Sequence, residues 1–291
     1  MLNAGQCRSI LSSIEHQTKT HRMMQMIPNL DTSKLADGTR EQMNDYLART
    51  MSFSAITVGM DAKTSKGEKL NVRTAVSYLA PFTLSGVNVC PMAELANCHE
   101  PCLFTAGRGA MSSVMCSRTM RTLICQQYPE IFLAQLRKEL VSHCKACARD
   151  GIVPAYRPNG TSDIRWERWD AWCDLMQELV AEYGLRVYDY TKIPNRNVPA
   201  WYDLTYSYSG SIGYQPFVRR AVANGERIAV VFRNRETVLA MLDNRETFLG
   251  LSIVDGDDTD VRFYDPKNCV VALYAKGQAK HDQSGFVVDR S

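Results

Sequence analysis

Residues 87–102 have the sequence VNVCPMAELANCHEPC, in which a strand-like run ends and a cysteine-rich loop begins. Cys90, Cys98 and Cys102 follow the run directly and are separated by seven and then three residues. Proline and polar residues surround them, which is typical of a loop. Thiolates on such a loop can converge on a soft metal or on the iron of an iron–sulfur cluster. We therefore predict that this loop binds a metal ion or a cluster.

Seven of the ten cysteines lie between residues 87 and 147, so further ligands could come from the same region. A fourth thiolate from Cys116 would close a cluster, whereas three thiolates leave one iron open for a substrate or for S-adenosylmethionine. Cys144 and Cys147 form a CxxC pair, which is a weak zinc half-site; the alternative is two thiols at a helix end. His99 and His143 are either further ligands or surface residues.

The chain has 291 residues, of which 45% are hydrophobic and 22% charged, and its formal net charge is +3. This length fits one large α/β domain with an appendage, and the hydrophobic content argues against extensive disorder. The charge is too small to indicate nucleic-acid binding, although it allows a local basic groove. No apolar run approaches the roughly 20 residues that span a bilayer, and the first residues lack a signal-peptide pattern. We therefore expect a cytoplasmic protein with no membrane partner and with reduced cysteines.

From residue 74 onward, strand-like and helix-like segments alternate, which is typical of βαβ units and a parallel sheet. The predicted strands are residues 75–89, 152–156, 185–190, 201–206, 227–232, 261–264 and 270–275, and the predicted helices are residues 111–127, a segment beginning at 129, a tryptophan-rich segment at about 166–183, and residues 214–223 and 235–242. Five or six β/α units predict an incomplete (β/α) barrel over residues 74–291, with an open doubly wound sheet as the second choice. Residues 1–73 are predicted to form an N-terminal appendage of two helices and a hairpin.

Polar residues follow the predicted strands at the edge where parallel α/β folds bind their ligands. The candidates for a substrate or cofactor pocket are Asn159, Thr161, Asp163, Asp189, Lys192 and Lys276. We expect them to converge on one pocket, with Asp163 and Lys192 pairing beside the cysteine loop, because a buried carboxylate needs a cation. The alternatives are ordinary polar loops and, for Asp163, a helix cap. The acidic run at residues 255–260 offers oxygen ligands for Mg²⁺ or Ca²⁺ but is more typical of an exposed turn.

An ordered set of sequence blocks spans most of this region. The blocks are CPxAxxxxCxxxC at residues 90–102, RPNGTSDI at 157–164 with WE at 166–167, YDYTK at 188–192, LTYS at 204–207, AKG at 275–277 and DxSGFV at 282–287. Together they resemble a bacteriophage family of the gene-product-eighty-eight type over roughly residues 77–288. The resemblance implies a phage or prophage origin, and therefore the cytoplasm of a host cell, but it brings no established activity.

The expected architecture is also similar to that of the radical S-adenosylmethionine superfamily, in which an incomplete (β/α) barrel carries three cysteines after its first strand. The similarity implies a 4Fe-4S cluster on Cys90, Cys98 and Cys102, with S-adenosylmethionine as a second cofactor. The spacing departs from the CxxxCxxC loop of that superfamily. Our leading hypothesis is an iron–sulfur protein of phage type that acts on a small molecule or a nucleic acid. The alternative is a non-enzymatic phage protein that is stabilised by zinc and binds nucleic acid or a host factor.

Overall fold

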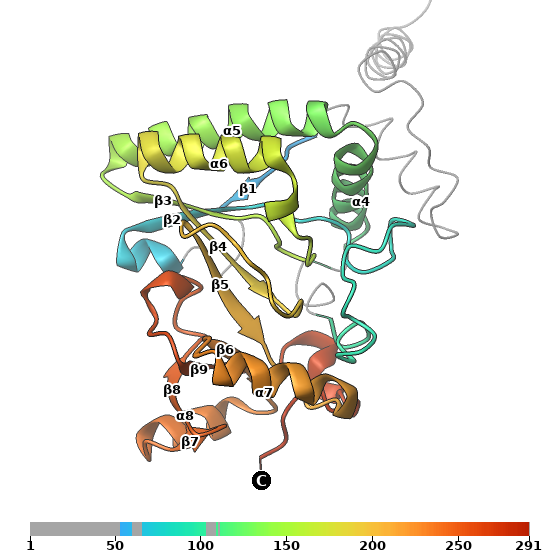
Figure 1. Cartoon of the computed structure of the whole chain (residues 1–291), viewed down its shortest axis with the longest axis vertical. Coiled ribbons are helices and arrows are strands. Elements are labelled where there is room, and N and C mark those ends of the chain that lie inside the picture. The colour runs from blue at the N-terminus through green and yellow to red at the C-terminus, as the bar shows by residue number, and fades with distance from the viewer. Residues whose placement is uncertain (1–52, 60–65, 103–108, 110, 291) are drawn as a thin grey trace, which may run out of the picture.

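The computed structural model describes residues 53–59, 66–102, 109 and 111–290 (Figure 1). Its strands are β1 Thr57–Val58, β2 Val72–Val76, β3 Val153–Arg157, β4 Arg186–Thr191, β5 Tyr202–Ser207, β6 Ile228–Phe232, β7 Thr247–Phe248, β8 Leu251–Asp255 and β9 Cys269–Tyr274. Its α-helices are α4 Ser112–Gln127, α5 Pro129–Asp150, α6 Asp170–Tyr183, α7 Gln215–Ala223 and α8 Arg235–Asp243. The two helices predicted before residue 50 lie outside the described residues.

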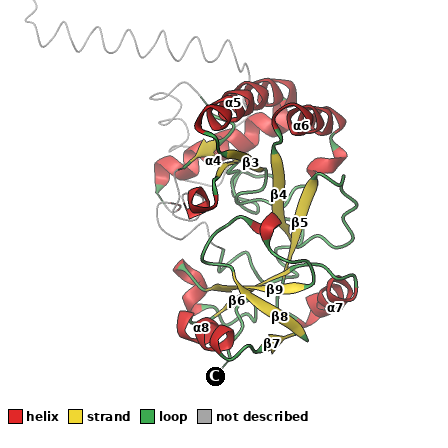
Figure 2. Ribbon diagram, turned by 90° about the vertical axis from the view of Figure 1, so that its left-hand side faces the viewer, coloured by secondary structure: helices red, strands yellow, loops and turns green. Residues whose placement is uncertain are grey.

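The nine strands form one sheet in the order β1-β2-β3-β4-β5-β6-β9-β8-β7. Every pair from β2 to β8 is parallel, and the short strands β1 and β7 add antiparallel edges. The predicted α/β class is confirmed. The sheet is not closed, because β1 and β7 remain at opposite edges (Figure 1). Figure 2 shows the strands from β3 to β7 from the side. The predicted domain boundary at residue 73 falls inside β2, so residues just before it belong to the same sheet.

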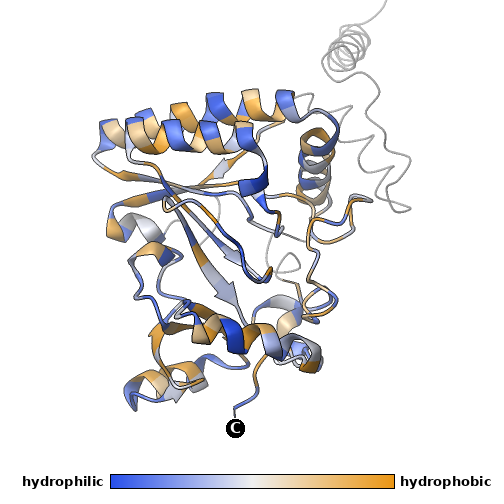
Figure 3. Cartoon of the chain, in the orientation of Figure 1, coloured by the Kyte–Doolittle hydropathy of each residue, from blue (hydrophilic) through white to orange (hydrophobic). Residues whose placement is uncertain are grey.

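The α-helices in the described part of the chain pack on one face of the sheet. Helices α4, α5 and α6 bury their apolar residues against strand residues such as Tyr156 and Val187. Helices α7 and α8 cover the same face further along, against Val230 and Ala272. Along α5 and α6, hydrophobic and hydrophilic residues alternate in bands (Figure 3), as expected for helices with one buried side. Right-handed crossovers between successive neighbouring strands place these helices on one side. None of the described helices has the length and hydropathy needed to cross a bilayer.

The strand order reverses at its end, because β9 lies between β6 and β8 although it follows β8 in sequence. A right-handed connection that runs backwards along a sheet must cross the face opposite to the helices. Residues 256–268 make this crossing, and Val261 packs there against Val72, Ala155 and Tyr188. The strand predicted at residues 261–264 is wrong, since Arg262–Tyr264 is a turn of 3-10 helix, and its Phe263 ring packs edge-on against Tyr188 of β4.

Buried ion pairs lie under this crossing segment. Asp260 Oδ2 accepts a hydrogen bond from Arg157 Nη1 at 2.8 Å, and Asp260 Oδ1 accepts one from the Tyr190 hydroxyl at 3.0 Å. Asp257 and Asp260 are only 7% and 3% exposed, so the exposed turn predicted for residues 255–260 is wrong for these two. A carboxylate is needed here because an arginine on the covered face would otherwise be an unpaired buried charge.

Candidate functional site

The cysteine-rich loop follows β2 and lies against the carboxyl ends of the next strands. The Asp163 backbone N–H donates to the Val89 carbonyl at 2.8 Å, and the Cys90 thiol donates a long hydrogen bond to the Thr161 carbonyl at 3.9 Å. Further along the loop, the Ser209 hydroxyl donates to the Ala96 carbonyl at 2.7 Å. These contacts join the loop to the segments after β3 and β5. The structure therefore brings Cys90 together with two of the predicted pocket residues, Thr161 and Asp163.

The three loop thiols, Cys90, Cys98 and Cys102, are half-buried. Burial raises the pKa of Cys90 to about 12, and the nearby Asp163, Cys102 and Cys98 groups add smaller increases. The free thiol therefore keeps its proton at neutral pH, and a metal ion would have to displace that proton on binding. Among the residues that the structure describes, no three His, Cys, Asp or Glu side chains stand in an arrangement that could hold a metal ion. Ligation would need the thiols to move closer together.

Asp163 is buried beside the loop, but its partners differ from the one expected. Its carboxylate accepts hydrogen bonds from the Thr191 hydroxyl at 2.8 Å and from the backbone N–H of Lys192 at 2.7 Å. The guanidinium of Arg196 lies 3.7 Å away, so arginine is the closest cation rather than the Lys192 ammonium. Burial raises the pKa of Asp163, and these donors oppose the rise. The helix-cap alternative is wrong, because Arg165 is the N-cap of the next helical turn and Trp169 is that of α6.

Lys192 is held in place mainly through its backbone. Its carbonyl accepts hydrogen bonds from the Tyr206 hydroxyl at 3.3 Å and the Tyr214 hydroxyl at 2.9 Å. Its ammonium lies 4.9 Å from the centre of the Phe286 ring, a cation–π contact. The neighbouring Ser284 carbonyl accepts a hydrogen bond from Asn97 of the cysteine loop at 3.0 Å. Lys192 therefore stands where β4, the loop and the C-terminal segment meet.

Asn159 and Asp189 shape the loop after β3 rather than present free polar groups. Asn159 Oδ1 accepts hydrogen bonds from Ser162, Ile164 and Trp166 at 2.8–3.0 Å. Its Nδ2 donates to Asp189 at 2.8 Å, and Asp189 also accepts from the Tyr202 hydroxyl at 2.9 Å. The Thr161 hydroxyl likewise donates to the Leu79 carbonyl. Three of the six predicted pocket residues thus use their side chains to build the loop.

The ionisation of Asp189 predicts a pH dependence of stability. Burial raises its pKa to about 7, although Arg157, Arg196, Tyr202 and Asn159 limit the rise. A carboxyl with a raised folded pKa binds more protons in the folded state, so its stabilising contribution is complete below about pH 4 and is lost as the pH rises through about 7. We expect the thermal midpoint of the wild type to fall more steeply than that of Asp189→Asn between about pH 4 and 7.

The matched control for this prediction is Asp174→Asn, since Asp174 is an exposed carboxylate on α6. It should keep the wild-type dependence of the thermal midpoint on pH. If Asp189→Asn also kept the full wild-type slope, the raised pKa would not be the cause of the dependence.

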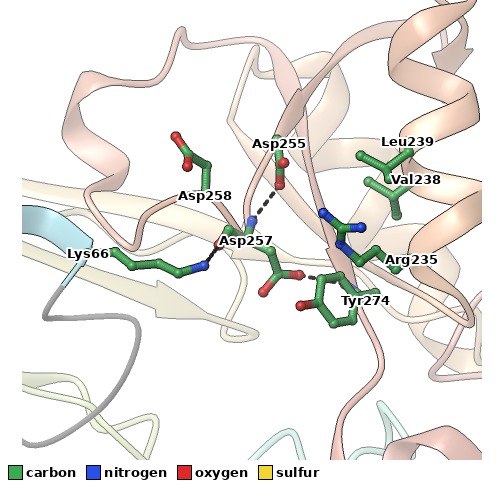
Figure 4. Close-up of a pocket in the computed structure, with 8 residues that line it drawn as sticks. All are labelled: Lys66, Arg235, Val238, Leu239, Asp255, Asp257, Asp258 and Tyr274. Atoms are coloured by element: carbon green, nitrogen blue, oxygen red, sulfur yellow. Dashed lines mark hydrogen bonds between the residues drawn. The ribbon is translucent and has the colours of Figure 1, made fainter. Parts of the chain in front are cut away.

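Lys276 makes its ion pair with a different strand-end residue from those that contact Asp163. Its ammonium pairs with Asp257 at 2.5 Å. Asp257 also lines a pocket of about 160 Å³ at the ends of β8 and β9 beside the first turn of α8 (Figure 4). The pocket residues are Lys66, Arg235, Val238, Leu239, Asp255, Asp257, Asp258 and Tyr274. The connections after β6 and β8 leave over opposite faces of the sheet, and such a switch point is where open α/β sheets form crevices.

The remaining candidate ligands do not join the loop thiols. Cys116, Cys144 and Cys147 are at most 2% exposed, in the core between the helices and the sheet. The Cys147 sulfur lies 3.8 Å from Nε2 of His143, which is itself buried. This placement favours the interpretation of these thiols as small hydrophobic core residues. His99 stays beside the loop, where its ring lies 5.4 Å from that of Phe82.

Two arginines at this edge of the sheet were not indicated by the sequence. Arg196 pairs with Glu167 at 2.6 Å and approaches Asp163, although it comes from a polar loop that looks solvated in the sequence. Arg118 is 8% exposed on α4, and its guanidinium lies 5.1 Å from the centre of the Tyr78 ring. A single arginine in an amphipathic helix carries no signal of burial, because arginine is usually on the solvent side.

The family model described as Gene product 88 matches residues 53–290. It is the family that the ordered sequence blocks resemble, and the matched range includes the whole described sheet and the three loop cysteines. No curated protein and no solved structure matches the chain.

Proposed function

The chain belongs to the Gene product 88 family, and we propose that it is an iron–sulfur protein whose cluster binds Cys90, Cys98 and Cys102. The observation that carries this proposal is that three half-buried thiols share one loop, and that the first of them, Cys90, lies against the segment after β3. Ligands of α/β folds bind at this edge. Cysteine thiolates are the usual protein ligands of iron–sulfur clusters.

The donor set fits a cluster better than a closed metal site. Cys116, Cys144 and Cys147 are buried in the helical core, so none of them is placed to complete a four-thiolate site with the loop. A cluster on three thiolates keeps one iron open. Such a cluster would supply an electron to a bound molecule, which is the chemistry of radical S-adenosylmethionine enzymes. We include this finer assignment in the proposal, with the substrate being a small molecule or a nucleic acid.

The residues around the thiols would act on the polar groups of a ligand. The Asp163 carboxylate is fixed by Thr191 and the Lys192 backbone, so it is oriented without needing to move. In the part of the chain that the structure describes, the Lys192 ammonium contacts an aromatic ring and no carboxylate within ion-pair distance, so its N–H donors could serve a ligand. Together they offer an acceptor and a cation beside the loop, and these would orient a ligand that carries both kinds of group.

Metal analysis of the full chain tests the proposal. Anaerobic reconstitution with iron and sulfide should give bound iron, acid-labile sulfide and a broad absorbance near about 400 nm. Stoichiometric zinc in a colourless protein that unfolds on chelation would favour the alternative, a zinc-stabilised protein that binds nucleic acid or a host factor. Absence of both metals after reconstitution would exclude both forms of the metal-site proposal.

A further inference from the structure

Arg118, on the second turn of α4, differs from the other deeply buried arginines of the described chain. Its Nε and Nη1 atoms are buried and have no hydrogen-bond partner among the described residues, as is also true of Nε and Nη1 of Arg262; the difference lies in the ion pairs. Arg196, Arg227 and Arg262 have side chains that are only 1% exposed, and each has a carboxylate oxygen within 2.6–2.9 Å. Arg118 has no such ion pair in the same part of the chain. It is therefore a buried cation whose charge no described carboxylate balances.

The groups around Arg118 compensate for little of the free energy that is lost when its charge is buried. The face of the Tyr78 ring gives a cation–π contact, which is weak beside the desolvation of a guanidinium. Burial correspondingly lowers the pKa of Arg118 from its ordinary value. Arg121, one turn later, shows the contrast: it is 4% exposed, and its guanidinium donates to the Ser54 carbonyl at 2.6 Å and to the Tyr78 carbonyl. Arg121 stabilises the fold through these bonds, whereas Arg118 does not.

Arg118 lies at the same edge of the sheet as the loop thiols. The ionisable groups that act on it are the Tyr78 hydroxyl and the Cys102 thiol. The Tyr78 ring packs on Gly160, where a Cβ atom would stand 2.5 Å from the ring, and Gly160 precedes the Thr161 carbonyl that the Cys90 thiol contacts. Tyr78, Cys102 and Thr161 are all half-exposed. Only one layer of side chains therefore separates the Arg118 guanidinium from the solvent-accessible surface.

We propose that Arg118 binds an oxyanion, the carboxylate or phosphate group of a ligand that lies against the cysteine loop. A guanidinium offers paired N–H donors in the geometry that carboxylates and phosphates accept, and it stays charged when buried. A bound oxyanion would satisfy the unpartnered atoms and neutralise the charge in one step. The ligand class is therefore an organic acid or a phosphate ester. This inference does not depend on the proposed cluster, because the Arg118 guanidinium lacks a described carboxylate partner whether or not a metal is bound.

The test compares Arg118→Met with Arg121→Met in the full chain, since both residues are buried arginines on α4. Thermal unfolding is measured in chloride, phosphate and acetate at equal ionic strength. We expect phosphate or acetate to raise the thermal midpoint of the wild type. Arg118→Met should unfold at or above the wild-type midpoint in chloride, because it removes an unbalanced buried charge, and should bind the anion about tenfold more weakly or worse. Arg121→Met should unfold at a lower midpoint in every salt and keep the anion response.

The two anions distinguish the source of the oxyanion: a response to phosphate alone indicates a phosphate ester, and a response to acetate alone indicates an organic acid. No response of the wild type to either anion would overturn the proposal. So would an equal anion response in Arg118→Met, or a loss of stability in that variant as large as in Arg121→Met. Iron is measured on the same samples. If Arg118→Met lost iron without any change in the anion response, the arginine would serve the metal loop and this proposal would be wrong. If the wild type bound no iron but still responded to the anion, only the proposed cluster would fail.

Discussion

Cys98→Ser is expected to remove essentially all iron from the reconstituted protein while the chain stays folded. With only three thiolates on the loop, the loss of one leaves too few ligands, and a serine hydroxyl is a poor ligand for a site that selects soft thiolates. The fold should tolerate the change because Cys98 is half-exposed and the hydrogen bond that fixes its position is its backbone N–H to the Ala93 carbonyl at 3.0 Å. Iron per chain, absorbance near about 400 nm and the thermal midpoint measure the outcome.

The matched control is Cys173→Ser. Cys173 is also half-exposed and free, but it lies on α6, where its thiol donates to the Glu167 carbonyl at 3.6 Å. This variant should bind as much iron as the wild type. Retention of iron by Cys98→Ser, or equal losses in the two variants, would show that the loop is not the site of a cluster.

Asp260→Ala is expected to lower the free energy of unfolding by about 3–5 kcal/mol, the usual cost of removing one partner of a buried ion pair. The change leaves the Arg157 guanidinium without its 2.8 Å partner and the Tyr190 hydroxyl without an acceptor. Asp189 recovers only part of the interaction, since it lies 3.6 Å from Nε of the same arginine. Urea denaturation of the wild type and the variant measures the difference.

An exposed ion pair provides the comparison for this prediction. Arg137 and Glu178 join α5 to α6, and their side chains are 50% and 42% exposed. Glu178→Ala should therefore cost less than about 1 kcal/mol. In the double variant Asp260→Leu with Arg157→Met, the apolar side chains should restore part of the loss, because neither charge of this pair remains buried. The recovery is incomplete because Asp189 loses its contact with Arg157. A loss for Asp260→Ala no larger than that for Glu178→Ala would mean that solvent reaches this pair freely.

The elements that local sequence pattern determines were predicted well. The helix predicted at residues 235–242 is α8, and the strand predicted at residues 227–232 is β6, each within one residue of the observed bounds. β8 was missed, because only one of its five residues is buried and an acidic run follows it. The order β6-β9-β8 could not be predicted either, since pairing between distant strands depends on contacts that no local pattern encodes. The wrong strand prediction at residues 261–264 follows from that strand order, because this segment crosses the face of the sheet and does not pair with its strands.

The candidate site was predicted in part, for a reason that the topology explains. Parallel strands bring their carboxyl ends to one edge, and for this reason Cys90 was expected near Asp163. The predicted strand at residues 75–89 is wrong beyond Val76, where β2 ends, so an irregular segment and not the strand itself carries Cys90 to this edge. The sequence pattern could not show that Lys276 pairs with Asp257 at a separate pocket, because the acidic run that contains Asp257 is typical of an exposed turn. It also could not identify Arg118. What distinguishes this arginine is burial without a carboxylate partner among the described residues, and that is a property of the packed structure.

The place of β9 in the sheet has a consequence for how the chain reaches its native state during synthesis. Strands β2 to β6 can pair in the order in which they leave the ribosome, because each lies beside its predecessor. β8 cannot join them in this way, since β9, which lies between β6 and β8 in the sheet, is the last strand to be synthesised. Until residues 269–274 emerge, the growing chain presents two unpaired strand edges with a gap one strand wide, the kind of edge that recruits other chains. A ribosome that stops just before β9 would therefore release a protein that lacks an interior strand of its sheet, not one that lacks a tail.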